Sequence, residues 1–278
     1  MAYNAGQIKE ILSNAGRRAN RALGQNFCTD TELLSRCVKT AGFSENSRVL
    51  EIGPGLGALT REVLAAGASV TAVEKDGFLA DLLPELLPDS RLNVYHEDIL
   101  RFPISEHVDP PFSVAGNLPY YITTPIVERM LPLFPDVMLF MVQKEVADRI
   151  LAAPGTENYG ALTIAAGYYA SLSNAGTVPP SCFYPRPGVD SALLLMRRYE
   201  ERPVRSRDEQ LMFRLVRASF NQRRKTLVNA VSHFEGLSFS REDVCRALVS
   251  CGLPEDVRGE RLSAADFAHL TDALLSFA

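Results

Sequence analysis

An apolar segment that runs into a glycine-rich turn constrains the fold of this chain more than any other feature. Residues 47–53 (SRVLEIG) have the composition of a buried strand, and residues 53–67 (GPGLGALTREVLAAG) indicate a turn that opens into a helix. Residues 69–76 (SVTAVEKD) return to a strand pattern. A strand, a helix and a second strand in this order predict a βαβ unit, and therefore a parallel sheet covered by helices on both faces.

The alternation of strands and helices continues as far as about Tyr199. The apolar spacing predicts strands at 92–99, 112–118 and 137–144, and helices at 31–42, 76–87 and 122–131. Asp30 and Gly42 are the expected caps of the first of these helices. Beyond Tyr199 helical segments replace the strands. We therefore predict an α/β Rossmann-like domain with a mostly parallel sheet over residues 1–199, and a small all-helical domain over residues 200–278.

Charge is distributed unevenly along the chain. The 278 residues carry a net charge of -4, which by itself argues against a nucleic-acid partner. Residues 197–225 nevertheless hold ten basic and four acidic side chains. Such a run is often only a solvated helix face, so the charge alone leaves a polyanion-binding surface and a solvated surface equally open.

Composition also sets expectations about the cellular setting. No segment approaches the roughly 18 consecutive apolar residues that a membrane span needs, and the first residues lack the layout of a secretory signal, so we expect a soluble, cytoplasmic protein. The five cysteines form no C-x-x-C pair and the four histidines are scattered. We therefore expect neither a disulfide framework nor a metal site. Nothing in the sequence requires more than a monomer.

The glycine-rich turn and the acidic residues that follow it predict a nucleotide cofactor. Gly53 and Gly55 let the backbone approach a ligand closely, and Glu74 ends the next strand, where a carboxylate accepts hydrogen bonds from both ribose hydroxyls. These features suit NAD and S-adenosylmethionine equally. Asp98, at the end of the third strand, is placed to accept the amino group of the cofactor's adenine, although singly it is as often a helix N-cap.

The segment Asn117-Leu118-Pro119-Tyr120, at the end of the fourth strand, favours methyl transfer to an adenine. The lone pair of an adenine amino group is delocalised into the ring, so a methyltransferase must draw it out. The Asn117 side-chain oxygen and the Leu118 carbonyl, held by the fixed φ of Pro119, are suited to accept the two amino hydrogens. Tyr120 would stack on a base removed from its neighbours. In isolation, such a segment is more often an ordinary turn beside a core tyrosine.

Four motifs together resemble the ribosomal RNA adenine N6,N6-dimethyltransferases, and most closely the bacterial members that act on the small subunit. These are EIGPGLGALT, NLPYYITTPI, FYPRPGVDSALL and SFNQRRKTLVNA, and the resemblance runs from about Arg18 to the C-terminus. It implies a class I methyltransferase domain, S-adenosylmethionine as the methyl donor, and cofactor contacts from these residues: Asn26, Cys28, Gly53, Gly55, Glu74, Asp98 and Asn117. Position 28 is usually leucine in the family, so a backbone contact is expected to survive the change there.

The resemblance also implies a second aromatic residue and an RNA substrate. Phe183 matches the aromatic that stacks on the target adenine opposite Tyr120; without the family it would be read as a core residue. The implied substrate is two adjacent adenosines in the loop of the 3'-terminal helix of small-subunit rRNA in an assembling 30S subunit. Arg223, Arg224 and Lys225 would then contact the RNA backbone.

Three alternatives remain open at this point. One is a related enzyme of large-subunit rRNA, which shares the catalytic motifs. Another is a ribosome-assembly factor that binds pre-rRNA without catalysis, against which the intact NLPY and GPGLG segments argue. A nicotinamide-dependent oxidoreductase is more distant, because NLPY has no role in that chemistry.

Overall fold

The computed structural model describes residues 2–277, which divide into two compact units. The first unit runs from the N-terminal residues to Ala147 and includes Leu172–Arg198, and the second comprises Asp148–Ser171 and the residues from Tyr199 onward. Within residues 2–277, no helix has both the length and the apolar character to cross a membrane.

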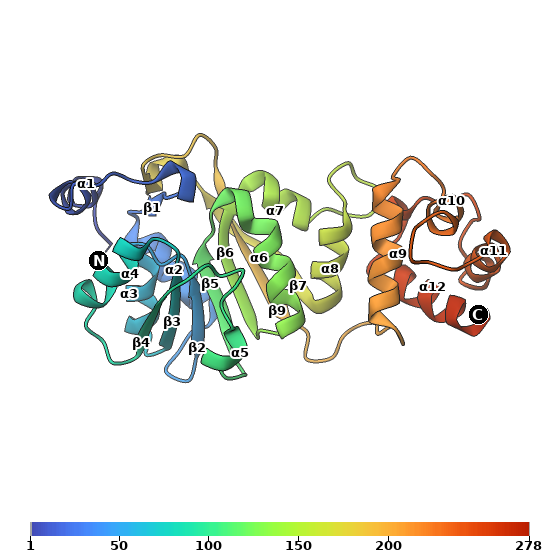
Figure 1. The fold of residues 1–278 in the computed structure, drawn as a ribbon, viewed down its shortest axis with the longest axis horizontal. Helices are drawn as coiled ribbons and strands as arrows, with labels where there is room; N and C mark the ends of the chain where they lie inside the picture. The colour runs from blue at the N-terminus through green and yellow to red at the C-terminus, as the bar shows by residue number, and fades with distance from the viewer. Residues whose placement is uncertain (1, 278) are drawn as a thin grey trace. The chain divides into compact units, whose positions relative to one another are not determined.

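A seven-stranded sheet forms the centre of the fold (Figure 1). Its strand order is β4 (Leu92–His96), β3 (Ser69–Glu74), β2 (Arg48–Ile52), β5 (Ser113–Asn117), β6 (Val137–Gln143), β9 (Ser191–Arg198) and β7 (Ala170–Val178). The strands from β4 to β6 are parallel, and β9 pairs antiparallel with β6. The predicted mostly parallel sheet is therefore confirmed. Because parallel strands all end at one edge, the segments after β2, β3, β4 and β5 meet there.

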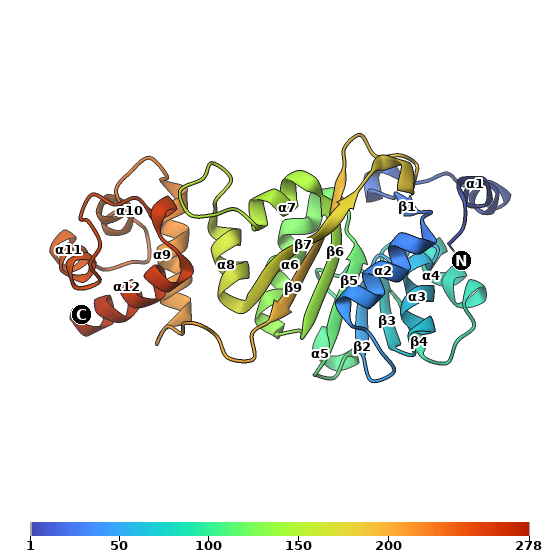
Figure 2. The same cartoon turned by 180° about the vertical axis from the view of Figure 1, so that it is seen from behind.

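Helices cover both faces of this sheet. Figure 2 shows α2 (Thr31–Ala41), α3 (Ala58–Ala65) and α4 (Gly77–Leu86) on the face turned to the viewer, and Figure 1 shows α5 (Ile104–His107) and α6 (Thr123–Met130) on the other. The ends of α2 follow directly from the sequence. The Asp30 side chain accepts a hydrogen bond from the Leu33 N–H, and Gly42 ends the helix at φ 79°. Both predicted caps are confirmed.

The residues before α2 form an arm that the sequence did not predict in detail. Its elements are α1 (Ala5–Asn14), the 3₁₀ turn η1 (Arg21–Leu23) and the short strand β1 (Phe27–Cys28). β1 pairs antiparallel with β8 (Phe183–Tyr184), which follows the 3₁₀ turn η4 (Pro180–Cys182). Two further 3₁₀ turns, η2 (Tyr120–Ile122) and η3 (Leu131–Leu133), flank α6. The pairing of β1 with β8 brings residues near 27 and 183 together.

The second unit is helical. It contains α8 (Ala161–Tyr169), α9 (Glu209–Asn221), α10 (Leu227–Ser232), α11 (Arg241–Ser250), η5 (Gly259–Arg261) and α12 (Ala264–Phe277), while α7 (Lys144–Ile150) spans the division between the units. Side chains of α8 share one apolar core with those of α9 to α12. The longer of its two segments starts at Tyr199, beside the predicted boundary at residue 200. The shorter segment is Asp148–Ser171, which the predicted boundaries assigned to the first domain. Long-range packing of α8 decides this assignment, and local sequence patterns do not report it.

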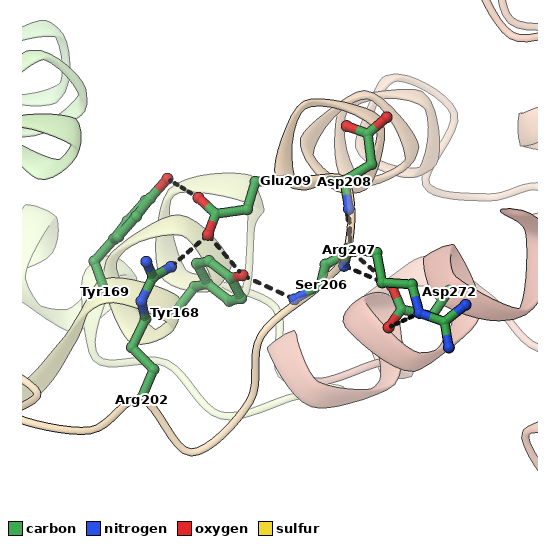
Figure 3. Close-up of polar contacts among 8 residues, drawn as sticks. All are labelled: Tyr168, Tyr169, Arg202, Ser206, Arg207, Asp208, Glu209 and Asp272. Carbon is green, nitrogen blue, oxygen red and sulfur yellow. Dashed lines mark hydrogen bonds and ion pairs between the residues drawn. The ribbon is translucent and has the colours of Figure 1, made fainter.

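A carboxylate at the start of α9 ties this unit's entry segment to α8 (Figure 3). Glu209 accepts hydrogen bonds from the hydroxyls of Tyr168 and Tyr169, each at 3.2 Å, and from the Arg202 guanidinium at 2.6 Å. Asp272 of α12 holds the same segment through the backbone N–H of Arg207. The segment that leads into α9 is therefore fixed by polar contacts as well as by the apolar core.

Candidate active site

A cavity of about 1020 Å³, its open mouth included, lies where β2, β3, β4 and β5 end. Several predicted cofactor residues line it, namely Asn26, Cys28, Gly53, Gly55, Glu74, Asp98 and Asn117. These residues come from four strand ends and from the N-terminal arm, so the fold brings together positions far apart in the sequence.

The glycine-rich turn lines the cavity and requires glycine for steric reasons. Gly55 has φ 59°, and a Cβ placed there would lie 3.1 Å from the Phe27 ring. Gly57 has φ 75°, and its Cβ would lie 2.6 Å from the Leu83 side chain. Both values of φ are in the left-handed region, which favours glycine. Only glycine allows the turn to pass this close to the arm and to α4.

Glu74 is held at the end of β3 by backbone donors on both sides. Its Oε2 accepts the Gly55 N–H at 3.0 Å, and its Oε1 accepts the Asp76 N–H at 2.9 Å. Burial raises the pKa of this carboxyl above its usual value. Each carboxylate oxygen has a further lone-pair direction, which suits the predicted bonds from ribose hydroxyls.

Asp98 lies just after β4 with both oxygens engaged. Oδ1 accepts the Leu100 N–H at 2.9 Å, and Oδ2 pairs with the Lys75 ammonium at 2.8 Å. The hydrogen bond from Lys75 lowers the pKa of Asp98 and keeps it ionised. An ionised carboxylate at the cavity wall suits its predicted role as acceptor for an adenine amino group.

Asn117 ends β5 with its amide orientation determined by the arm. Its Nδ2 donates to the Asn26 carbonyl oxygen at 2.7 Å. A carbonyl can only accept, so the amide nitrogen must face Asn26 and Oδ1 must face the other way. Asn26 is itself fixed, since its side chain donates to the Gly24 carbonyl at 3.1 Å. The arm therefore presents the Asn117 oxygen as an acceptor, as the predicted orientation of an adenine amino group requires.

The other predicted catalytic residues are placed differently. Pro119 lines the cavity, Leu118 is buried with its N–H bonded to the Met141 carbonyl, and the Tyr120 hydroxyl lies 3.0 Å from Ser191 Oγ. Phe183 is only 3% exposed and packs in the core, and in the described residues the cavity lining includes neither ring. The stacking of Tyr120 and Phe183 on a target base therefore stays a prediction.

Cys28 lines the cavity and also packs in the core. Burial raises the pKa of its thiol to about 12. The thiol is therefore protonated at neutral pH, and its side chain acts by packing.

Sequence reasoning missed three residues at this cavity. Lys75 pairs with Asp98, Tyr121 is 54% exposed at the cavity lining, and Glu51 is buried with no hydrogen-bond partner in the described residues for its Oε2. Glu51 precedes the glycine turn in the sequence, but nothing local signals that its carboxyl faces a cavity. A buried carboxylate oxygen without a partner fits a ligand that carries positive charge, as S-adenosylmethionine does at its sulfonium and ammonium groups.

Glu51 makes the stability of the ligand-free protein depend on pH. Burial, with a further contribution from the nearby Glu74 carboxylate, raises its pKa from 4.5 to about 7. The folded protein therefore retains a proton that the unfolded chain loses, so this group's contribution is complete below pH 4.5 and is lost as pH rises through 7. We expect Glu51→Gln to increase the free energy of unfolding above pH 7, relative to the wild type, by about 3 kcal/mol.

Urea unfolding at about pH 5 and about pH 8 measures this difference. The exposed Glu128→Gln is the matched control and should leave the pH profile unchanged. Parallel profiles for Glu51→Gln and the wild type would contradict the assignment.

The three basic residues predicted to contact RNA differ in the contacts that they make within the protein. The Arg223 guanidinium donates to the Glu157 carbonyl at 3.0 Å and lies 3.5 Å from a carboxylate oxygen of Glu260. Arg224 and Lys225 are exposed in the segment between α9 and α10. The predicted RNA contact is therefore best tested at Arg224 and Lys225, because Arg223 also stabilises the unit itself.

The chain is similar to known proteins over nearly its whole length. Residues 16–269 match the family described as ribosomal RNA adenine dimethylase. The chain is 39% identical over 287 residues to ribosomal RNA small subunit methyltransferase A of Lachnoclostridium phytofermentans, covering 99% of this chain and 98% of the relative. It is 43% identical over 278 residues to the protein of the same name from Streptococcus pneumoniae, covering 96% and 95%.

Two solved structures are also similar to this chain in fold and in sequence. A dimethyladenosine transferase from Plasmodium falciparum superposes with a TM-score of 0.73 and 25% identity, covering 87% of this chain and 95% of that one. The 23S rRNA methyltransferase ErmE superposes with a TM-score of 0.68 and 27% identity, covering 90% and 99%. The predicted methyltransferase activity and its methyl donor, S-adenosylmethionine, are thereby confirmed. This chain belongs to the ribosomal RNA adenine dimethylase family.

Proposed function

We propose that this protein dimethylates N6 of two adjacent adenosines in the loop of the 3'-terminal helix of small-subunit rRNA. It acts as a cytoplasmic monomer on an assembling 30S subunit. The observation that carries this proposal is the fixed Asn117 amide, whose Nδ2 donates to the Asn26 carbonyl and leaves Oδ1 as an acceptor at the cavity. The names of the relatives favour the small subunit as the source of the RNA.

The residues of the site would act on the target base by positioning it. Asn117 Oδ1 and the Leu118 carbonyl accept the amino hydrogens and draw the N6 lone pair out of the ring. That lone pair attacks the methyl carbon, the carbon–sulfur bond breaks with its electrons going to sulfur, and N6 releases one proton. A second transfer on the same nitrogen completes the dimethyladenosine. S-adenosylmethionine supplies the methyl group in each transfer, and no covalent intermediate with the protein is needed.

A comparison of two substrates tests which ribosomal RNA the protein methylates. Under-methylated small and large ribosomal subunits are each incubated with the protein and methyl-labelled S-adenosylmethionine. We expect label in the small-subunit RNA. Label only in large-subunit RNA would favour the activity named for ErmE, and binding of subunits without transfer would favour an assembly factor.

The exposed pair Arg224 and Lys225 would contact the phosphate backbone of the RNA. Each contact releases counterions, so the double change Arg224→Glu and Lys225→Glu is expected to reduce the slope of log K against log salt by roughly 1 to 2. Binding of small-subunit RNA is measured across a salt series. Lys39→Glu, at an exposed position near the end of α2, is the control. A weaker affinity with an unchanged slope would show that the pair does not contact phosphates.

A further inference from the structure

Arg129, in the last turn of α6, makes contacts that neither the sequence motifs nor the comparisons assign. Its Nη1 donates to the Leu100 carbonyl and its Nη2 to the Phe102 carbonyl, both at 2.7 Å. Its Nε is buried without a hydrogen-bond partner in the part of the chain described. The guanidinium is thus directed at two backbone carbonyls. Hydrogen bonds from a charged donor are stronger than neutral ones, so these two bonds hold the Arg129 side chain strongly to the backbone of residues 100–102.

The two carbonyls belong to the turn that holds Asp98. The Asp98 carbonyl accepts the N–H groups of Arg101 at 2.8 Å and Phe102 at 2.9 Å, and Asp98 Oδ1 accepts the Leu100 N–H at 2.9 Å. Leu100 therefore bonds Arg129 through its carbonyl and Asp98 through its N–H. The orientation of the Asp98 carboxylate depends on this turn, and the turn is held from outside by Arg129.

The position of α6 gives this contact a further consequence. α6 begins at Thr123, directly after the Pro119–Ile122 segment that follows Asn117. Arg129 therefore links the helix that follows this segment to the turn that contains Asp98. Arg129 forms no ion pair with a carboxylate among the described residues, so its two bonds to the turn are its polar contacts there.

We propose that Arg129 is a positioning residue for the cofactor's adenine, acting through Asp98. It holds the turn at residues 98–102 so that the Asp98 carboxylate keeps its direction toward the adenine amino group. This inference rests on the predicted role of Asp98 in the proposed function. Arg129 itself lies outside the residues that line the cavity.

Binding of two ligands tests the inference without any methyl transfer. One is S-adenosylhomocysteine, and the other is its analogue with purine in place of adenine, which lacks only the amino group. Calorimetry measures the dissociation constants for the wild type, Arg129→Met and Arg129→Lys. Arg48→Met is the matched control, because Arg48 is exposed and also donates to a backbone carbonyl, that of Pro110.

The wild type is expected to bind the adenine ligand roughly 10 to 100 times more tightly than the purine ligand, as a hydrogen bond to a charged group implies. Arg129→Met should weaken the adenine ligand by about tenfold and the purine ligand by less than about twofold. Arg129→Lys, which keeps the charge with one contact, should fall between. Arg48→Met should leave both affinities unchanged.

Two outcomes would overturn the inference in distinguishable ways. If the wild type discriminates but Arg129→Met and Arg129→Lys weaken both ligands equally, Arg129 only stabilises the fold. If the wild type binds both ligands equally, Asp98 does not recognise the amino group, and its role in the proposed function fails together with the inference. The Lys variant keeps the test valid if Arg129→Met does not fold.

Discussion

Replacing Asn117 with alanine is expected to lower kcat by roughly 10²- to 10³-fold, as loss of one preorganised hydrogen-bonding group does in other active sites. In the proposed function the amide oxygen accepts an amino hydrogen and so draws out the adenine lone pair, and its direction is fixed by the bond from Nδ2 to the Asn26 carbonyl. Binding of S-adenosylhomocysteine should weaken by less than about tenfold, because only one hydrogen bond at the cavity is lost. Single-turnover methyl transfer and calorimetry measure the two effects separately.

Two further variants make this prediction specific. Asn117→Asp keeps an acceptor but has no donor for the Asn26 carbonyl, so the fixed orientation is lost and kcat should fall as well. Asn93→Ala, at an exposed position on β4, should leave both kinetic and binding constants unchanged. Equal losses of turnover and cofactor affinity in Asn117→Ala would show that Asn117 only holds the cofactor.

Replacing Glu74 with alanine should weaken cofactor binding far more than it lowers kcat, which is the reverse of the result expected for Asn117→Ala. Loss of two bonds from ribose hydroxyls to a carboxylate, each worth about 1.5–3 kcal/mol, is expected to weaken S-adenosylhomocysteine by roughly 10²-fold or more. The change also leaves the N–H groups of Gly55 and Asp76 without their acceptor, which loosens the glycine-rich turn. At saturating cofactor, kcat should change much less.

Calorimetry of Glu74→Ala measures this loss, with Glu85→Ala as the control because Glu85 is exposed on α4. Circular dichroism before titration confirms that the sheet is intact. A dissociation constant within about threefold of the wild type, less than one hydrogen bond is worth, would contradict a ribose contact from Glu74.

Local features of the sequence predicted the framework of this site. The caps of α2 at Asp30 and Gly42 depend on neighbouring residues and were predicted directly. The glycine-rich turn was predicted in the same way, although the left-handed φ of Gly55 and Gly57 became known only from the structure. The period of the apolar pattern predicted the strands from β2 to β6. The end of each strand then placed Glu74, Asp98 and Asn117 at one edge, because the topology of a parallel sheet requires it.

Contacts between distant segments could not be predicted in this way. Arg129 reaches a turn 27 to 29 residues earlier, and the Asn117–Asn26 bond spans 91 residues. β7 is largely exposed, with a polar, small-residue sequence that carries no strand signal. The pairing of Phe183 with Cys28 across β1 and β8 joins segments 155 residues apart, and no local pattern indicates that the Phe183 ring is buried in the core. Tertiary packing decides each of these features.

The most direct test of the account is a time course of methyl transfer from labelled S-adenosylmethionine to under-methylated small ribosomal subunits, with nucleoside analysis of the RNA. We predict N6-methyladenosine as an early product that converts to N6,N6-dimethyladenosine, and the same products formed roughly 10² to 10³ times more slowly with Asn117→Ala. Label in any other nucleoside, or cofactor binding with no transfer to any ribosomal RNA, would contradict the proposed function.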